Sequence, residues 1–222
     1  MQRLHLLKAK IERAFQIYFK STEKDIIDDS KGFFYKVFTV QIIIILIYSI
    51  GNLIVTYSVN FDEVSALNMR MRLLFEQRGV SPFLYSMNTY PYTILWAIFF
   101  ILLYQLFATF SKYLVLKAFS ENNVSMISLL GIEITSYSRF ILCLFPILLY
   151  AELFPEQYKQ ELLPLLFYSS IYLITLLCGV YLYASRYVKL SQMIFSQAIG
   201  RAIFTFSTPI LAVFFIVIWI IR

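Results

Sequence analysis

The sequence predicts an all-α fold: a polytopic membrane protein with a five-helix transmembrane bundle and an amphipathic N-terminal helix. Composition is the first indication, because 60% of the 222 residues are hydrophobic and only 14% are charged. Soluble domains carry about 25% charged residues. The second indication is the length of the apolar runs. Residues 37–61 contain no charged residue, and about 20 apolar residues of helix are enough to cross a hydrocarbon core. A helix is expected there because it pairs every backbone polar group within the segment.

Residues 1–36 form a basic segment that we assign to the cytoplasm. Apolar residues recur there three or four positions apart, as on one side of a helix; they are Leu4, Leu7, Ile11, Phe15 and Tyr18. Arg3, Lys8, Lys10 and Arg13 lie on the other sides. A basic amphipathic helix before a membrane span is typical of a helix lying in the lipid headgroups. Packing on a partner protein is the alternative.

Five spans make up the transmembrane domain, residues 37–222. They are predicted at about 37–59, 92–113, 137–154, 162–185 and 202–221. A loop is expected at 118–136 and a linker at 186–201. The third span is short and contains Pro146, which should bend the helix, so a re-entrant segment is the alternative there.

The first external loop is expected to contain a short helix between Asn60 and Gly79. Asn60 suits the N-cap, Gly79 suits the position after the helix, and Pro82 prevents continuation. In the second span, Gln105 is expected to form a hydrogen bond between helices.

The fourth span is rich in small residues, among them Ser170, Cys178 and Gly179. Small residues let membrane helices approach closely, so we expect this helix at the centre of the bundle. This face and the four cations named above are the candidate interaction surface.

Charge indicates the orientation. With the N-terminus in the cytoplasm, five spans place 14 Lys and Arg residues inside and 5 outside, as the positive-inside rule requires. Membrane orientation therefore explains the excess of basic residues, which does not indicate binding to nucleic acid. Expected partners are membrane lipids and other membrane proteins or a second copy of the chain.

The residue types needed for catalysis are sparse. His5 is the single histidine, so a His-based triad or metal site within the chain is excluded. Every Asp and Glu is predicted in a loop or at a span end, whereas proton and ion pathways use ionisable residues inside spans. We therefore expect no enzyme, no catalytic residue, no cofactor and no metal.

With these features in place, the chain resembles the Yip1 family of five-span membrane proteins over most of residues 37–222. The resemblance rests on the span order, on Tyr137-Ser138 followed by Pro146, on Ser196-Gln197-Ala198, and on Pro209 in the last span. The chain lacks the Asp-Leu-Tyr-Gly-Pro run of eukaryotic members and has Ser136 where they have Gly. These differences favour a bacterial cytoplasmic membrane over the endoplasmic reticulum or Golgi.

The resemblance implies a non-catalytic integral membrane protein that acts in membrane trafficking or organisation through protein or lipid partners. The alternative function is the transmembrane subunit of a transporter that a partner chain supplies with energy. A lipid-modifying enzyme would need polar groups that converge at one membrane face, and the spans do not supply them.

Overall fold

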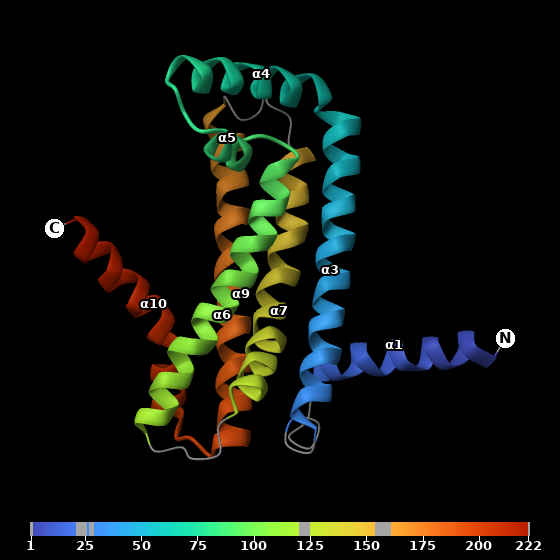
Figure 1. The fold of residues 1–222 in the computed structure, drawn as a ribbon, viewed down its shortest axis with the longest axis vertical. Coiled ribbons are helices and arrows are strands. Elements are labelled where there is room, and N and C mark those ends of the chain that lie inside the picture. The colour runs from blue at the N-terminus through green and yellow to red at the C-terminus, as the bar shows by residue number, and fades with distance from the viewer. Residues whose placement is uncertain (1, 21–25, 27–28, 120–124, 154–160, 222) are drawn as a thin grey trace. The chain divides into compact units, whose positions relative to one another are not determined.

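The structure is a computed structural model that describes residues 2–20, 26, 29–119, 125–153 and 161–221. Its regular elements within these ranges are helices, without a strand (Figure 1). They are α1 (Gln2–Lys20), α3 (Ser30–Val59), α4 (Phe61–Gln77), α5 (Pro82–Asn88), α6 (Tyr92–Ala118), α7 (Met126–Leu153), α9 (Leu162–Phe195) and α10 (Ile199–Ile221).

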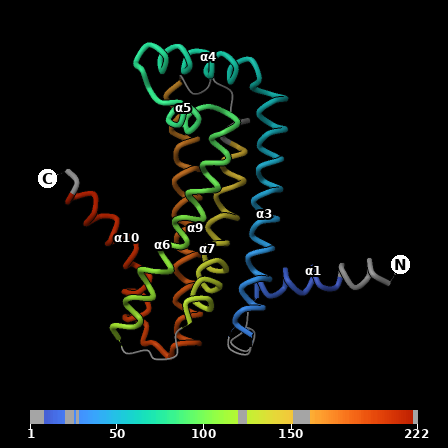
Figure 2. Tube along the Cα trace, in the orientation of Figure 1, coloured from blue at the N-terminus to red at the C-terminus, as the bar shows by residue number. Residues whose placement is uncertain are grey.

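Five of these helices are long and apolar enough to cross a membrane: α3, α6, α7, α9 and α10. Their order along the chain can be followed in Figure 2. The predicted fold class, an all-α polytopic bundle, is therefore confirmed. Many apolar side chains on these helices remain exposed, as expected of surfaces whose solvent is lipid.

The helices extend beyond the apolar runs that predicted them. The loop expected at 118–136 is wrong over 126–136, because α7 begins at Met126. The linker expected at 186–201 is also wrong, since α9 continues to Phe195 and α10 begins at Ile199. Hydropathy locates the lipid-crossing part of a helix, whereas backbone hydrogen bonding continues through polar and charged residues.

Pro146 lies inside α7, which is one helix of 28 residues. The re-entrant alternative for this segment is therefore not supported. Pro209 likewise lies inside α10. Proline is tolerated in membrane helices because neighbouring groups re-satisfy the freed carbonyl.

The chain divides into two compact units, which we describe separately. Unit 1 comprises residues 1–43, 104–143 and 176–222, and unit 2 comprises residues 44–103 and 144–175. Within unit 1, α9 buries Gly179, Tyr183, Tyr187, Leu190, Ser191 and Phe195. The fourth span runs through both units, and its place at the centre of the bundle stays a prediction.

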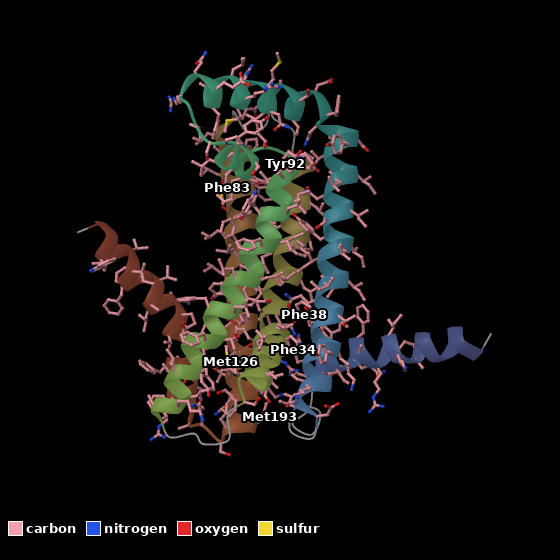
Figure 3. The ribbon with its side chains drawn as sticks, in the orientation of Figure 1. Phe34, Phe38, Phe83, Tyr92, Met126 and Met193 are labelled. Atoms are coloured by element: carbon pink, nitrogen blue, oxygen red, sulfur yellow. The ribbon has the colours of Figure 1, made fainter. Side chains whose placement is uncertain are left out.

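Two glycines mark the close contacts of unit 1. The Phe33 ring lies against Gly131, where an added Cβ would stand 2.6 Å from a ring carbon. An added Cβ at Gly179 would stand 3.1 Å from the Phe140 ring. On the same unit, Phe34 stacks on Phe38 one turn later in α3 (Figure 3). These contacts bring α3 and α9 against α7.

Unit 2 contains α4 and α5, the two helices between the first and second spans. The predicted helix after Asn60 is confirmed, although the Asn60 side chain makes no capping hydrogen bond. Gly79 has φ of 62°, and Val80 N–H donates to the Phe75 carbonyl at 2.9 Å. This is a Schellman ending, for which glycine is favoured. Beyond it, Phe83 of α5, which is labelled in Figure 3, meets Trp96 of α6 edge to face.

Candidate functional site

A cluster of ionisable side chains is buried in unit 1, where α6, α7 and α9 meet. Lys112 of α6 and Glu133 of α7 have no exposed surface, and Tyr183 of α9 is 4% exposed. Lys112 Nζ lies 2.5 Å from Glu133 Oε2 and donates to the Tyr183 hydroxyl at 3.0 Å. The Tyr183 hydroxyl in turn donates to Glu133 Oε1. We call Lys112, Glu133 and Tyr183 the ionic cluster.

Aromatic rings enclose the ammonium group of this cluster. Lys112 Nζ lies 4.0 Å from the centroid of the Tyr187 ring and 5.1 Å from that of Phe206. A cation over an aromatic face is attracted by the ring quadrupole, most strongly when both are shielded from water. Because Phe206 belongs to α10, the ionic cluster connects four helices of unit 1.

The ionic cluster is balanced and internally satisfied. The positive and negative charges cancel, and both carboxylate oxygens accept a hydrogen bond. Such pairing is required, because an isolated charge in a medium of low dielectric constant is very costly. The arrangement therefore holds α6, α7 and α9 together in one register. Neither oxygen of the Glu133 carboxylate is left without a hydrogen-bond donor.

A second polar contact in unit 1 joins α3 to α6. Gln41 Nε2 donates to Gln105 Oε1 at 2.8 Å, and Gln105 Nε2 donates back to Gln41 Oε1 at 3.1 Å. Both residues are buried. The predicted interhelical hydrogen bond of Gln105 is therefore confirmed, with Gln41 as its partner.

The C-terminal end of α1 is fixed in the same unit. Ile17 and Tyr18 are buried, and Arg139 Nη2 of α7 donates to the Phe19 carbonyl at 2.9 Å. Burial raises the pKa of Tyr18 above its ordinary value, and the nearby Ser138 hydroxyl opposes that rise. A cation at the last turn of a helix also complements the helix dipole.

The predicted interaction residues do not come together in one site. Lys10 and Arg13 are exposed on α1. Arg3 and Lys8 belong to α1, but their side chains lie outside the described part of the structure. On α9, Ser170 is exposed in unit 2, whereas Cys178 is exposed and Gly179 is buried in unit 1.

Sequence reasoning missed the ionic cluster. The predicted second span, about 92–113, places Lys112 at its end, and the loop predicted at 118–136 includes Glu133. One signal was available: Glu133 is the single carboxylate in an otherwise apolar run at 124–134. The expectation that every carboxylate lies in a loop or at a span end was wrong for Glu133, which is buried inside α7.

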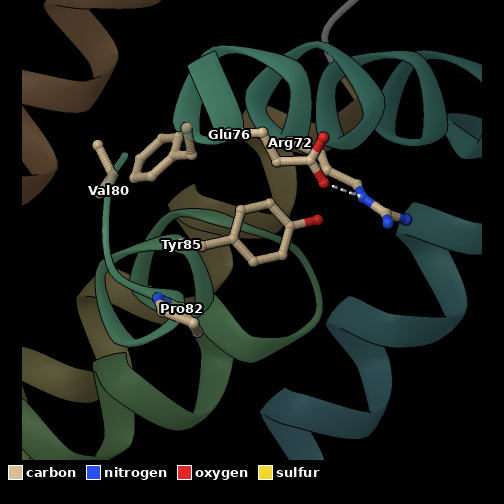
Figure 4. Close-up of a pocket in the computed structure, with 6 residues that line it drawn as sticks. Arg72, Glu76, Val80, Pro82 and Tyr85 are labelled. Atoms are coloured by element: carbon tan, nitrogen blue, oxygen red, sulfur yellow. Dashed lines mark hydrogen bonds and ion pairs between the residues drawn. The ribbon is translucent and has the colours of Figure 1, made fainter. Parts of the chain in front are cut away.

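Unit 2 carries a shallow external hollow of about 190 Å³ (Figure 4). It is lined by Arg72, Phe75, Glu76, Val80, Pro82 and Tyr85. The Arg72 guanidinium and the Glu76 carboxylate pair at 2.9 Å, and this contact raises the pKa of Arg72. Both side chains are more than half exposed, and exposed ion pairs contribute little to stability.

Within the described residues, no group of three His, Cys, Asp or Glu side chains is placed to hold a metal ion. Comparison with protein families, curated proteins and solved structures finds no match.

Proposed function

We propose that the chain is a non-catalytic integral membrane protein that acts in membrane trafficking or organisation through protein or lipid partners, as the Yip1 resemblance implies. The observation that supports this proposal is the attachment of α1. Its C-terminal end is anchored by Ile17, Tyr18 and the Arg139 contact, while Lys10 and Arg13 remain exposed.

Anchoring of one end gives the exposed cations of α1 a defined position on unit 1. A basic helix beside a membrane attracts anionic lipid headgroups and acidic protein surfaces. A helix that merely floated in the headgroups would need no buried tyrosine and no arginine on its last carbonyl. The anchored geometry favours recognition of a partner by this helix.

The proposed orientation has the N-terminus in the cytoplasm, because residues 1–36 carry eight of the 19 Lys and Arg residues and basic flanks stay inside. We propose the bacterial cytoplasmic membrane rather than the endoplasmic reticulum or Golgi, because the chain lacks the Asp-Leu-Tyr-Gly-Pro run of eukaryotic Yip1 members and has Ser136 where they have Gly.

A second candidate function is the transmembrane subunit of a transporter with an energising partner chain. The buried Lys112–Glu133 pair favours it, because ionisable residues inside membrane helices often mark transport pathways. Against it, the pair is mutually neutralised and both carboxylate oxygens are occupied.

Charge reversal on α1 tests the proposal. We expect the double variant Lys10→Glu/Arg13→Glu to lose partners that co-purify in mild detergent in stoichiometric amount, quantified by mass spectrometry. The matched control, Arg70→Glu on α4 combined with Arg78→Glu at its C-cap, should keep them. Equal retention by both variants would refute the proposal, and a stoichiometric ATPase would favour the transporter.

Truncation provides a second arm of the same test. Removal of residues 1–16 leaves Ile17, Tyr18 and Phe19 in place, so the protein should still insert in the membrane and lose its partners. Failure of this variant to insert would count against the assigned role of α1.

A further inference from the structure

Unit 2 contains a cavity of about 370 Å³ between α3, α6 and α7. This volume lies in the range of small-molecule sites, about 300–1,000 Å³. Its 13 lining residues come from α3, α6 and α7, together with Tyr90 just before α6.

The wall of this cavity is suited to hydrocarbon. Most of its surface comes from branched aliphatic side chains and from the stacked rings of Tyr48 and Phe145, whose centroids are 3.8 Å apart. The three helices are membrane-spanning, so the molecules that reach the cavity are lipids. A lipid acyl chain that enters the cavity moves from the apolar bilayer into an apolar cavity. It gains van der Waals contacts with the cavity wall that an empty cavity would lack.

One polar group faces the cavity from a buried position. Asn52 is 6% exposed and lines the wall. Its Oδ1 accepts a hydrogen bond from the Tyr90 hydroxyl at 3.4 Å. In the part of the chain that the structure describes, Asn52 Nδ2 has no acceptor. The neighbouring Ser49 hydroxyl donates to the Ile45 carbonyl at 2.8 Å and is thus already used. Asn52 Nδ2 is not among the fully buried polar atoms that lack a partner, so the donor is open to the cavity, where a ligand carbonyl can accept its hydrogen bond.

The polar end of the cavity is held in place by α4. Asn68 Nδ2 donates to the Tyr90 carbonyl at 2.8 Å, and the Tyr90 N–H donates to Asn68 Oδ1 at 3.2 Å. This two-point contact fixes the Tyr90 backbone, and the Tyr90 hydroxyl lies beside the Asn52 amide.

We propose that this cavity binds one acyl chain of a membrane glycerophospholipid, whose ester carbonyl accepts a hydrogen bond from Asn52 Nδ2. The ester is favoured over a free fatty acid because none of the 13 lining residues is Lys, Arg or His, and a carboxylate in an apolar site needs a cationic partner. The inference concerns unit 2 alone and holds whatever partner α1 recognises.

Photo-crosslinking of the full chain in lipid nanodiscs tests the proposal. The probe is phosphatidylcholine with a diazirine on one acyl chain, and crosslinked residues are mapped by mass spectrometry. We expect the label to concentrate on Ile94, Ile98 and Leu144 of the cavity wall. The variant Ala97→Phe, which fills the cavity, should lose this label several-fold, whereas the matched control Leu95→Phe on the exposed side of α6 should keep it.

The variant Asn52→Leu is a second test that does not depend on correct folding of the Ala97→Phe protein, because it keeps the number and branching of the side-chain heavy atoms and removes the donor. We expect it to reduce wall labelling about fivefold, as for the loss of one hydrogen bond of roughly 1 kcal/mol. Labelling spread evenly over lipid-facing positions, or unchanged in Asn52→Leu, would overturn the proposal. Stronger wall labelling by diazirine palmitic acid than by the phosphatidylcholine probe would overturn the assignment to an ester.

Discussion

The two units use particular buried polar side chains differently. In unit 1, Lys112 pairs with Glu133 and Tyr183, and Gln41 pairs with Gln105, although the Tyr187 hydroxyl and Gln197 Nε2 are buried there without a hydrogen-bond partner among the described residues. In unit 2 the buried amide of Asn52 directs a donor toward a cavity instead. Mutual satisfaction fixes helices against one another, whereas a remaining donor beside empty space is suited to a ligand. The difference suggests that unit 1 supplies rigidity and unit 2 supplies a binding site.

Substitutions in the ionic cluster should have the largest effect on stability and therefore test this comparison first. Lys112→Met should lower the free energy of unfolding by about 3–5 kcal/mol, because it leaves the Glu133 carboxylate buried without its cation. The measurement is SDS-titrated unfolding in detergent micelles. The control is Lys117→Met, an exposed lysine on the same helix, which should be nearly neutral.

The double variant Lys112→Met/Glu133→Gln sharpens this test. It removes both charges, so much of the lost stability should return. If Lys112→Met proved as stable as the parent chain, the ionic cluster would not be a structural tether, and the transporter alternative would gain support.

The glutamine pair should give an intermediate effect. Gln105→Leu removes two hydrogen bonds and leaves the buried Gln41 amide without its partner, so we expect a loss of roughly 1–2 kcal/mol in the same unfolding assay. Gln41→Leu/Gln105→Leu should recover part of it. Two single variants whose losses simply add in the double variant would contradict the pairing.

The smallest effect should come from two glycine-to-alanine variants. At Gly51, in unit 2, an added Cβ meets nothing within 4 Å, so alanine should stabilise α3 by about 0.5–1 kcal/mol. At Gly179, in unit 1, the Cβ would lie 3.1 Å from Phe140 and 3.2 Å from Cys143, which should cancel that gain. Equal stabilisation at both positions would show that α9 does not approach α7 this closely.

Sequence reasoning predicted the fold class and the local features that depend on neighbouring residues. The five apolar spans follow from hydropathy alone. The end of α4 at Gly79 follows from the conformational freedom of glycine, since φ is positive there. Gln105 was also recognisable, because an amide within an apolar run needs a partner.

The ionic cluster was beyond such reasoning because it depends on tertiary distance. Lys112 and Glu133 are 21 residues apart with the end of one helix and the start of another between them. Either residue alone is typical of a membrane boundary. The two charged side chains can be buried only because they approach each other and the Tyr183 hydroxyl of a third helix. The cavity was equally hidden, because Asn52, Tyr90 and Phe145 come from three separate segments.

The close approach at Gly179 has a practical consequence for spectroscopy. The chain contains two thiols; Cys178 is exposed, and Cys143 is partly covered beside Gly179. A membrane-permeant maleimide should therefore modify Cys178 faster than Cys143, and separation of α7 and α9 should speed the modification of Cys143. The natural protein thus carries both an attachment point for a fluorophore and a reporter of helix separation, and neither has to be engineered.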